Sequence, residues 1–101
     1  MQTAFEAIVE PVRRELLDLL VDGPRAVGEL VAASGLSQPN TSRHLRVLRD
    51  CGLVHSKVDG KRRLYELSAD GFIELERWLA PYVHLWRGGL DALQTHLDET
   101  E

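Results

Sequence analysis

The apolar residues at the start of the chain recur every three or four positions, which is the spacing of amphipathic helices. Residues 3–9 and 12–21 each carry such a stripe. Pro11 can occupy the first turn of the second helix, where a backbone N–H is not needed. Asp22-Gly23-Pro24 is a combination that ends helices. The pattern therefore predicts two consecutive helices at the N-terminus.

Two further helices are predicted in the next thirty residues. The first covers 26–33 and stops before Gly35, which readily adopts the left-handed conformation of a helix cap. Ser37 then offers an N-cap hydroxyl, and Pro39 falls in the first turn of the following helix. We expect this helix to reach about Asp50.

The pattern changes between residues 53 and 67, where two runs of β-forming residues flank Asp59-Gly60. This dipeptide is favoured in two-residue hairpin turns. If it forms the loop, Val58 pairs with Lys61. The prediction is a β-hairpin with apolar pairs at its base and charges at its tip.

A last helix is predicted after the hairpin, with Ser68 or Asp70 as its cap. Its apolar residues form a heptad-like stripe made of Leu75, Leu79, Tyr82, Trp86, Leu90, Leu93 and Leu97. Pro81 and Gly88-Gly89 interrupt the stripe, so a kink or break is expected there. The predicted fold class is α+β, with five or six helices and one hairpin in a single domain spanning 1–101.

The two short helices joined at 34–36 match the helix-turn-helix plan, with the motif spanning about 26–50 and the wing about 53–67. Projected at 100° per residue, the inward stripe of the second helix contains Thr41, Leu45 and Leu48. Ser42, Arg43 and Arg46 point away from that stripe, and Gln38 lies at the leading end. Hydrogen-bonding groups and cations on that face are what bases and phosphates require.

The charge distribution supports this interpretation. The 101-residue chain has a net charge of −4, but residues 37–63 hold seven basic and two acidic residues. The rest of the chain holds five basic and fourteen acidic residues. One basic segment beside an acidic remainder both attracts and orients a polyanion.

The predicted DNA-binding residues lie on the second helix and the wing. They are Ser37, Gln38, Asn40, Ser42, Arg43, Arg46, Lys61, Arg62 and Arg63. We expect Gln38, Ser42 and Arg43 to reach bases. Arg46 and the three wing cations are expected to hold phosphates or enter the minor groove. A solvated surface helix is the alternative reading of the same pattern.

The chain resembles the ArsR family of winged-helix repressors over nearly its whole length. The resemblance lies in Glu10-Pro11-Val12-Arg13-Arg14, Val27-Gly28-Glu29-Leu30, Leu36-Ser37-Gln38-Pro39, Ser42-Arg43-His44-Leu45-Arg46-Val47-Leu48, Cys51-Gly52-Leu53-Val54, Asp59-Gly60-Lys61-Arg62-Arg63 and Tyr65-Glu66-Leu67. It implies an obligate homodimer built on the first and last helices. It also implies repression of nearby genes from a double-stranded DNA operator, with release by an effector that the sequence leaves unknown.

The aromatic and aliphatic stripe of the last helix is independently suited to a dimer seam. The predicted interface residues are Phe5, Ile8, Leu75, Trp78, Leu79, Tyr82, Trp86, Leu90 and Leu93. Packing within one chain is the alternative. We favour the dimer because so small a chain can hardly cover the stripe unaided.

Metal sensing is a weaker alternative. The segment 27–32 lacks the cysteine pair used by metal-sensing relatives, and the last helix offers only His84, His96 and Glu99 as candidate ligands. In metal-sensing relatives an acidic residue stands two positions before the first histidine, where this chain has Tyr82. The interval between His84 and His96 is also one residue longer than in the metal-binding pattern of those relatives. We therefore predict no metal and no cofactor.

Other classes of protein find little support. The chain carries no glycine-rich phosphate loop or nucleophile elbow, so no enzyme is predicted. Its apolar runs are too short for a membrane span, and Cys51 is the only cysteine, so we expect a cytoplasmic protein with an inert thiol. A redox switch at Cys51, and a winged helix that binds only proteins, are the alternatives left open.

Overall fold

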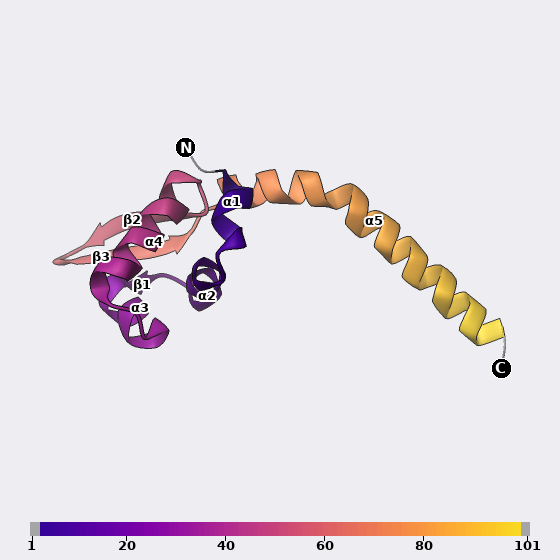
Figure 1. The fold of residues 1–101 in the computed structure, drawn as a ribbon, viewed down its shortest axis with the longest axis horizontal. Coiled ribbons are helices and arrows are strands. Elements are labelled where there is room, and N and C mark those ends of the chain that lie inside the picture. Colours follow the sequence, from indigo (N-terminus) through magenta and orange to yellow (C-terminus); the bar gives the residue numbers. More distant parts are fainter. Residues whose placement is uncertain (1–2, 100–101) are drawn as a thin grey trace.

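The computed structural model describes residues 3–99 and has a head of short elements from which one long helix projects (Figure 1). The head contains α1 (Ala4–Val9), α2 (Pro11–Leu19), β1 (Arg25–Ala26), α3 (Val27–Ser34), α4 (Gln38–Asp50), β2 (Val54–Asp59) and β3 (Arg62–Leu67). The long helix is α5 (Ala69–Glu99). The predicted mostly helical, winged architecture is confirmed.

The first two helices are joined by a tight, well-bonded corner. The side chain of Thr3 caps α1 by accepting from the backbone N–H of Glu6 at 3.3 Å. Pro11 begins α2. Arg14 reaches back and donates to the carbonyl oxygen of Ile8 at 2.8 Å. A carbonyl at the C-terminal end of α1 is thereby satisfied by a cation, which also suits the helix dipole.

The hydrophobic core lies where α1 to α4 meet the base of the hairpin. Its buried members are Ala4, Ala7, Leu16, Leu17, Leu20, Leu30, Leu45, Leu48, Leu53, Val54 and Tyr65. Ile8, Phe72 and Leu75 pack against its edge and are only partly buried. The core therefore belongs to the head, and α5 contributes to it only near its start.

The hairpin forms with a register two residues away from the predicted one. Asp59 pairs with Arg62 and Val58 pairs with Arg63. The loop is therefore Gly60-Lys61, and the predicted pairing of Val58 with Lys61 is wrong. A loop at Asp59-Gly60 would need a positive φ at Asp59, but the positive φ values in residues 3–99 belong to glycines, with Gly60 at 63°.

A third strand was not predicted. β1 pairs antiparallel with β3, which places Arg25 opposite Tyr65 and gives the sheet order β1-β3-β2. Two residues are too few to show an alternating pattern, so the sequence carries no signal for this strand. Its effect is to join the base of the wing to the start of α3.

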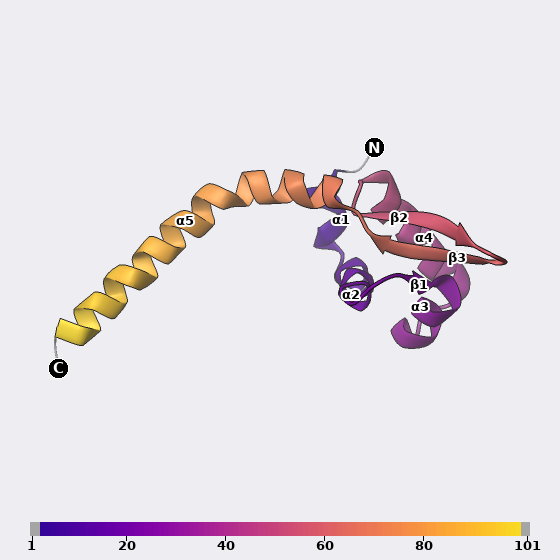
Figure 2. The ribbon, with the colours of Figure 1, turned by 180° about the vertical axis from the view of Figure 1, so that it is seen from behind.

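The last helix is continuous from Ala69 to Glu99, so the break expected at Gly88-Gly89 is absent. Figures 1 and 2 show that it changes direction partway along. Pro81 lies inside it and removes one backbone donor, which is a common cause of such a bend. No helix in the part of the chain that the structure describes is long and apolar enough to cross a membrane.

Candidate DNA interface

The start of α4 is fixed by its own side chains. The hydroxyl of Ser37 accepts from the backbone N–H of Asn40 at 3.3 Å. The hydroxyl of Thr41 donates to the carbonyl oxygen of Ser37 at 3.0 Å. Ser37 therefore acts first as an N-cap. These two hydrogen bonds fix the residue at which α4 begins and the conformation of its exposed first turn.

The helical projection of α4 is confirmed. Thr41, Leu45 and Leu48 are each 0 % exposed. Gln38, Asn40, Arg43 and Arg46 are exposed, and Ser42 is half-buried. Within residues 3–99, the side chains of Arg43 and Arg46 make no hydrogen bond or ion pair, so both guanidinium groups are available to an external partner.

His44 lies beside this face and belongs to the scaffold. Its Nδ1 lies 3.3 Å from Nε of Arg13 in α2, which donates to it. Burial lowers the pKa of His44, and the charges of Arg13 and Arg43 lower it further. The ring is therefore neutral at pH 7 and ties α4 to α2.

The wing carries three exposed cations with different partners. Arg63 donates to the hydroxyl of Ser56 at 3.2 Å. Arg62 forms an ion pair with Glu29 of α3, with 2.5 Å between Nη2 and Oε1. Lys61 at the tip has no such partner among the described residues. The three side chains predicted to contact phosphate therefore differ in whether they already have a partner within the protein.

Glu66 is paired with two side chains of the opposite strand of the hairpin. Glu66 lies 2.6 Å from Nε2 of His55 and 3.5 Å from Nζ of Lys57. The hydrogen bond from His55, together with the charge of Lys57, lowers the pKa of Glu66. Lys57 is thus neutralised locally. The free positive charge gathers on α4 and at the tip of the wing.

Figures 1 and 2 show α3, α4 and the hairpin together at the end of the molecule farthest from the C-terminal end of α5. An exposed helix face with unpaired arginines stands beside a basic β-hairpin. This arrangement defines a winged helix-turn-helix protein whose second helix is shaped for the major groove.

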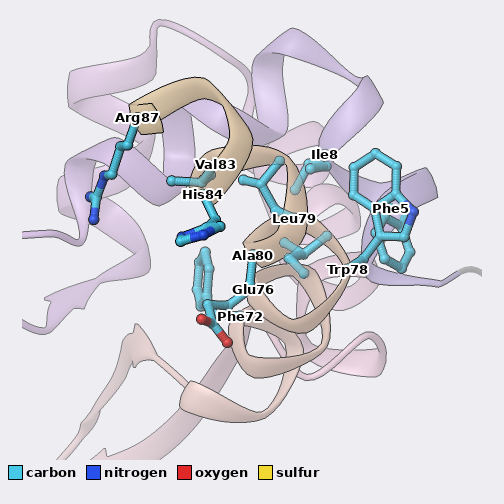
Figure 3. Close-up of a pocket in the computed structure, with 11 residues that line it drawn as sticks. Phe5, Ile8, Phe72, Glu76, Trp78, Leu79, Ala80, Val83, His84 and Arg87 are labelled. Carbon is cyan, nitrogen blue, oxygen red and sulfur yellow. The ribbon is translucent and has the colours of Figure 1, made fainter. Parts of the chain in front are cut away.

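A second surface lies between α1 and α5 (Figure 3). It is an open groove of about 820 Å³, and its apolar walls include Phe5, Ile8, Phe72, Leu75, Trp78, Leu79 and Val83. The rings of Phe5 and Trp78 meet edge to face with centroids 5.6 Å apart. Glu76, His84 and Arg87 add the polar part of the lining. The groove is thus mainly hydrophobic.

Beyond this groove α5 is exposed on every side. Trp86, Leu90, Leu93 and Leu97 are between 46 % and 68 % exposed. The predicted stripe is present, and its members beyond the groove are left largely exposed by the described residues 3–99. The alternative of packing within one chain therefore applies to the residues nearest α1 and not to this segment.

His84 lies far from the other candidate metal ligands. His84 lines the groove, and His96 lies twelve residues further along the same continuous helix. At 1.5 Å per residue this separation is about 18 Å, which is too far for one metal ion to bridge within the chain. Residues 3–99 contain no cluster of three or more His, Cys, Asp or Glu side chains able to hold a metal.

Cys51 follows α4 and is half-buried. Burial raises the pKa of its thiol, and the carboxylate of Asp50 raises it further. Because the thiolate is the reactive form, both effects reduce the reactivity of this cysteine.

Three positions matter to this site but were not predicted as functional. Arg14 holds the α1–α2 corner by its bond to Ile8, and Arg13 ties α2 to α4 through His44. Glu29 binds both the start of α3 and the wing. An acid in the first turn of a helix is a usable signal for Glu29 as a capping residue. No sequence pattern indicates its contact with Arg62, thirty-three positions away.

Residues 10–56 match the family model described as "Bacterial regulatory protein, arsR family". The HTH-type transcriptional regulator Rv2034 of Mycobacterium tuberculosis is 39 % identical over 72 residues, covering 71 % of this chain and 67 % of that protein. The transcriptional repressor SdpR of Bacillus subtilis is 27 % identical over 83 % of this chain and 93 % of its own length.

A solved structure shows the same fold. The homodimeric winged helix-turn-helix DNA-binding domain of Mb0332 from Mycobacterium bovis superposes with a TM-score of 0.66 at 27 % identity. The match covers 80 % of this chain and 75 % of that one. The chain belongs to the ArsR family of winged helix-turn-helix transcriptional regulators. It is a DNA-binding regulator and not an enzyme.

Proposed function

We propose that this protein is a homodimeric, sequence-specific repressor that binds an inverted-repeat operator. The observation that carries the proposal is the exposed face of α4, where Arg43 and Arg46 have no partner within residues 3–99. Cations left unpaired beside a basic wing are suited to DNA. A two-fold dimer presents two such helices, so half-sites lie about 10 bp apart or a multiple of that.

The contacts divide between base reading and phosphate binding. Gln38, Ser42 and Arg43 read bases, with Ser37 and Asn40 at the entrance of the groove. Arg46, Lys61, Arg62 and Arg63 bind the backbone. Arg43 lies almost opposite the buried stripe of α4, so it reaches farthest toward the floor of a groove. This geometry supports a base-reading role for it.

A second copy of the chain covers the groove and the exposed stripe of α5. The radius of gyration is 18.0 Å, whereas a compact chain of this length has about 13 Å. The single chain is therefore extended, and its described residues 3–99 leave the apolar stripe of α5 largely uncovered. The homodimeric state named for the Mb0332 domain supports the same assignment. The interface contains Phe5, Ile8, Leu75, Trp78, Leu79, Tyr82, Trp86, Leu90 and Leu93.

Repression follows from the position of the bound dimer on the DNA. A protein that covers both half-sites excludes other proteins from the same DNA, and the relative SdpR carries the name of repressor. The groove between α1 and α5 forms part of the interface. A ligand that changed the packing there would alter the spacing of the two α4 helices and so release the operator.

The experiment compares Arg43→Ala with Arg46→Ala by fluorescence anisotropy at fixed salt. The probes are an operator obtained by selection from a random pool and a scrambled duplex. Arg43→Ala is expected to cost about 1–3 kcal/mol on the operator and to relax the choice at one base pair. Arg46→Ala is expected to weaken both duplexes alike. Parallel losses on both duplexes for Arg43→Ala would make Arg43 a phosphate contact.

A further inference from the structure

The ion pair between Arg62 and Glu29 links the wing to the helix-turn-helix. Arg62 begins β3 and Glu29 lies in the first turn of α3. Their side chains are 57 % and 48 % exposed, so each remains within reach of an external partner. The same Oε1 of Glu29 also accepts from the backbone N–H of Ala26 at 3.3 Å.

The position of the wing does not depend on this ion pair. Strand β3 pairs with β2 from Asp59 opposite Arg62 to Val54 opposite Leu67. It also pairs with β1 at its other edge. Backbone ladders on both sides therefore hold β3 in place. The main consequence of the ion pair falls on Arg62 itself, whose charge is neutralised before any DNA arrives.

We propose that Glu29 competes with DNA phosphates for Arg62 and thereby lowers the DNA affinity of the protein. The inference rests on the proposed function, because it assumes that the wing approaches the backbone of DNA. A phosphate that takes the Nη2 donor of Arg62 must displace the carboxylate of Glu29. The carboxylate then stays unpaired beside a polyanion. Both consequences weaken binding, and both depend on the charge of Glu29.

The test is Glu29→Gln, measured by fluorescence anisotropy on the selected operator and on a scrambled duplex at low salt. Glutamine keeps an oxygen for the N–H of Ala26, so the start of α3 is retained. Because exposed ion pairs contribute modestly, binding is expected to tighten about two- to fivefold on both duplexes. The gain should shrink as salt rises.

Glu15→Gln is the matched control, since it makes the same change of net charge on α2, away from the wing. It is expected to change affinity less than Glu29→Gln does. An equal gain from both variants would mean that only net charge matters, which would overturn the proposal.

Arg62→Ala is the variant that shows whether Glu29 acts through Arg62. It should weaken DNA binding more in the Glu29→Gln background than in the wild-type chain, because part of the gain from Glu29→Gln requires Arg62. A gain from Glu29→Gln that is undiminished when Arg62 is already alanine overturns the competition, because the gain would then come from the lost charge of Glu29 alone. Weaker binding by Glu29→Gln overturns it as well. Wild-type protein that binds neither duplex contradicts the proposed function, which is a different outcome from any of these.

Discussion

The head and the far part of α5 use leucine in opposite ways. Leu16, Leu45 and Leu48 are 0 % exposed in the head, whereas Leu93 and Leu97 on α5 are about half exposed. Both sets recur at helical spacing in the sequence. The difference teaches that periodicity indicates which face of a helix is to be covered. It does not indicate whether the same chain or a second copy covers it.

Removing a leucine from each region should separate the two cases. Leu45→Ala is expected to lower the free energy of unfolding by about 2–5 kcal/mol, because it leaves a cavity between α4 and the rest of the core. Leu97→Ala removes the same atoms from a site that is about half exposed in the single chain, so its loss should be smaller and should act through the dimer, varying with protein concentration. Urea unfolding measures both variants, and equal losses would contradict the comparison.

Trp86→Glu tests whether a second copy covers the apolar stripe of α5. Two-fold symmetry places the new carboxylates on both copies of the seam, so the dimer dissociation constant should rise about 100-fold or more. The variant should sediment at the 11.4 kDa of one chain at micromolar concentration.

Val21→Glu is the control for that change, because Val21 is 66 % exposed and lies outside α1 and α5. It should leave the dimer intact. A wild-type protein that sediments as a monomer at micromolar concentration would contradict the account of α5.

Two glycines on α5 should respond with opposite signs. A Cβ at Gly71 would lie 2.7 Å from a methyl carbon of Leu53 and 2.8 Å from the carbonyl oxygen of Cys51, whereas a Cβ at Gly88 meets nothing within 4 Å. Gly71→Ala is expected to cost about 1–3 kcal/mol of folding free energy. Gly88→Ala should instead stabilise the helix by about 0.5–1 kcal/mol. Thermal unfolding of both variants checks the sign, and a loss at Gly88 would show that the face of α5 that bears Gly88 is packed.

The smallest expected effect is on the pH dependence of the free energy of unfolding, and it arises from His44 in the head. The pKa of His44 is lowered in the folded protein, so the unfolded chain takes up a proton first as the pH falls. This contribution to the free energy of unfolding is therefore present above about pH 6.5 and is lost below it. His44→Asn, which keeps an acceptor for Arg13, should show a flatter dependence in urea unfolding between pH 7.5 and 5.5. Identical slopes would exclude His44 as the source.

The sequence predicts the parts of this structure that local rules determine. The inward stripe of α4 follows from the helical period, and the N-cap at Ser37 follows from its hydroxyl. The hairpin register was missed by two residues, because Asp59-Gly60 and Gly60-Lys61 both provide a glycine for the turn. The observed strand pairing and φ values separate them.

The site was predicted less completely than the fold. Cationic residues on α4 and the wing were found from charge and periodicity. The pairing of Arg62 with Glu29 joins positions far apart in sequence, and β1, which lies between them in the fold, is too short to leave a pattern. Contacts of this kind arise from tertiary packing and are not encoded in any one segment.

The central claim is that α5 joins two copies so that their α4 helices read one operator together. The most direct test is fluorescence anisotropy with two duplexes that carry the same two inverted half-sites, one with the spacing of the selected operator and one with 5 bp inserted between the half-sites. One dimer should bind the first duplex about tenfold or more tightly, because a 5 bp insertion turns the second half-site to the opposite face of the DNA. Equal affinity for the two spacings would contradict the claim.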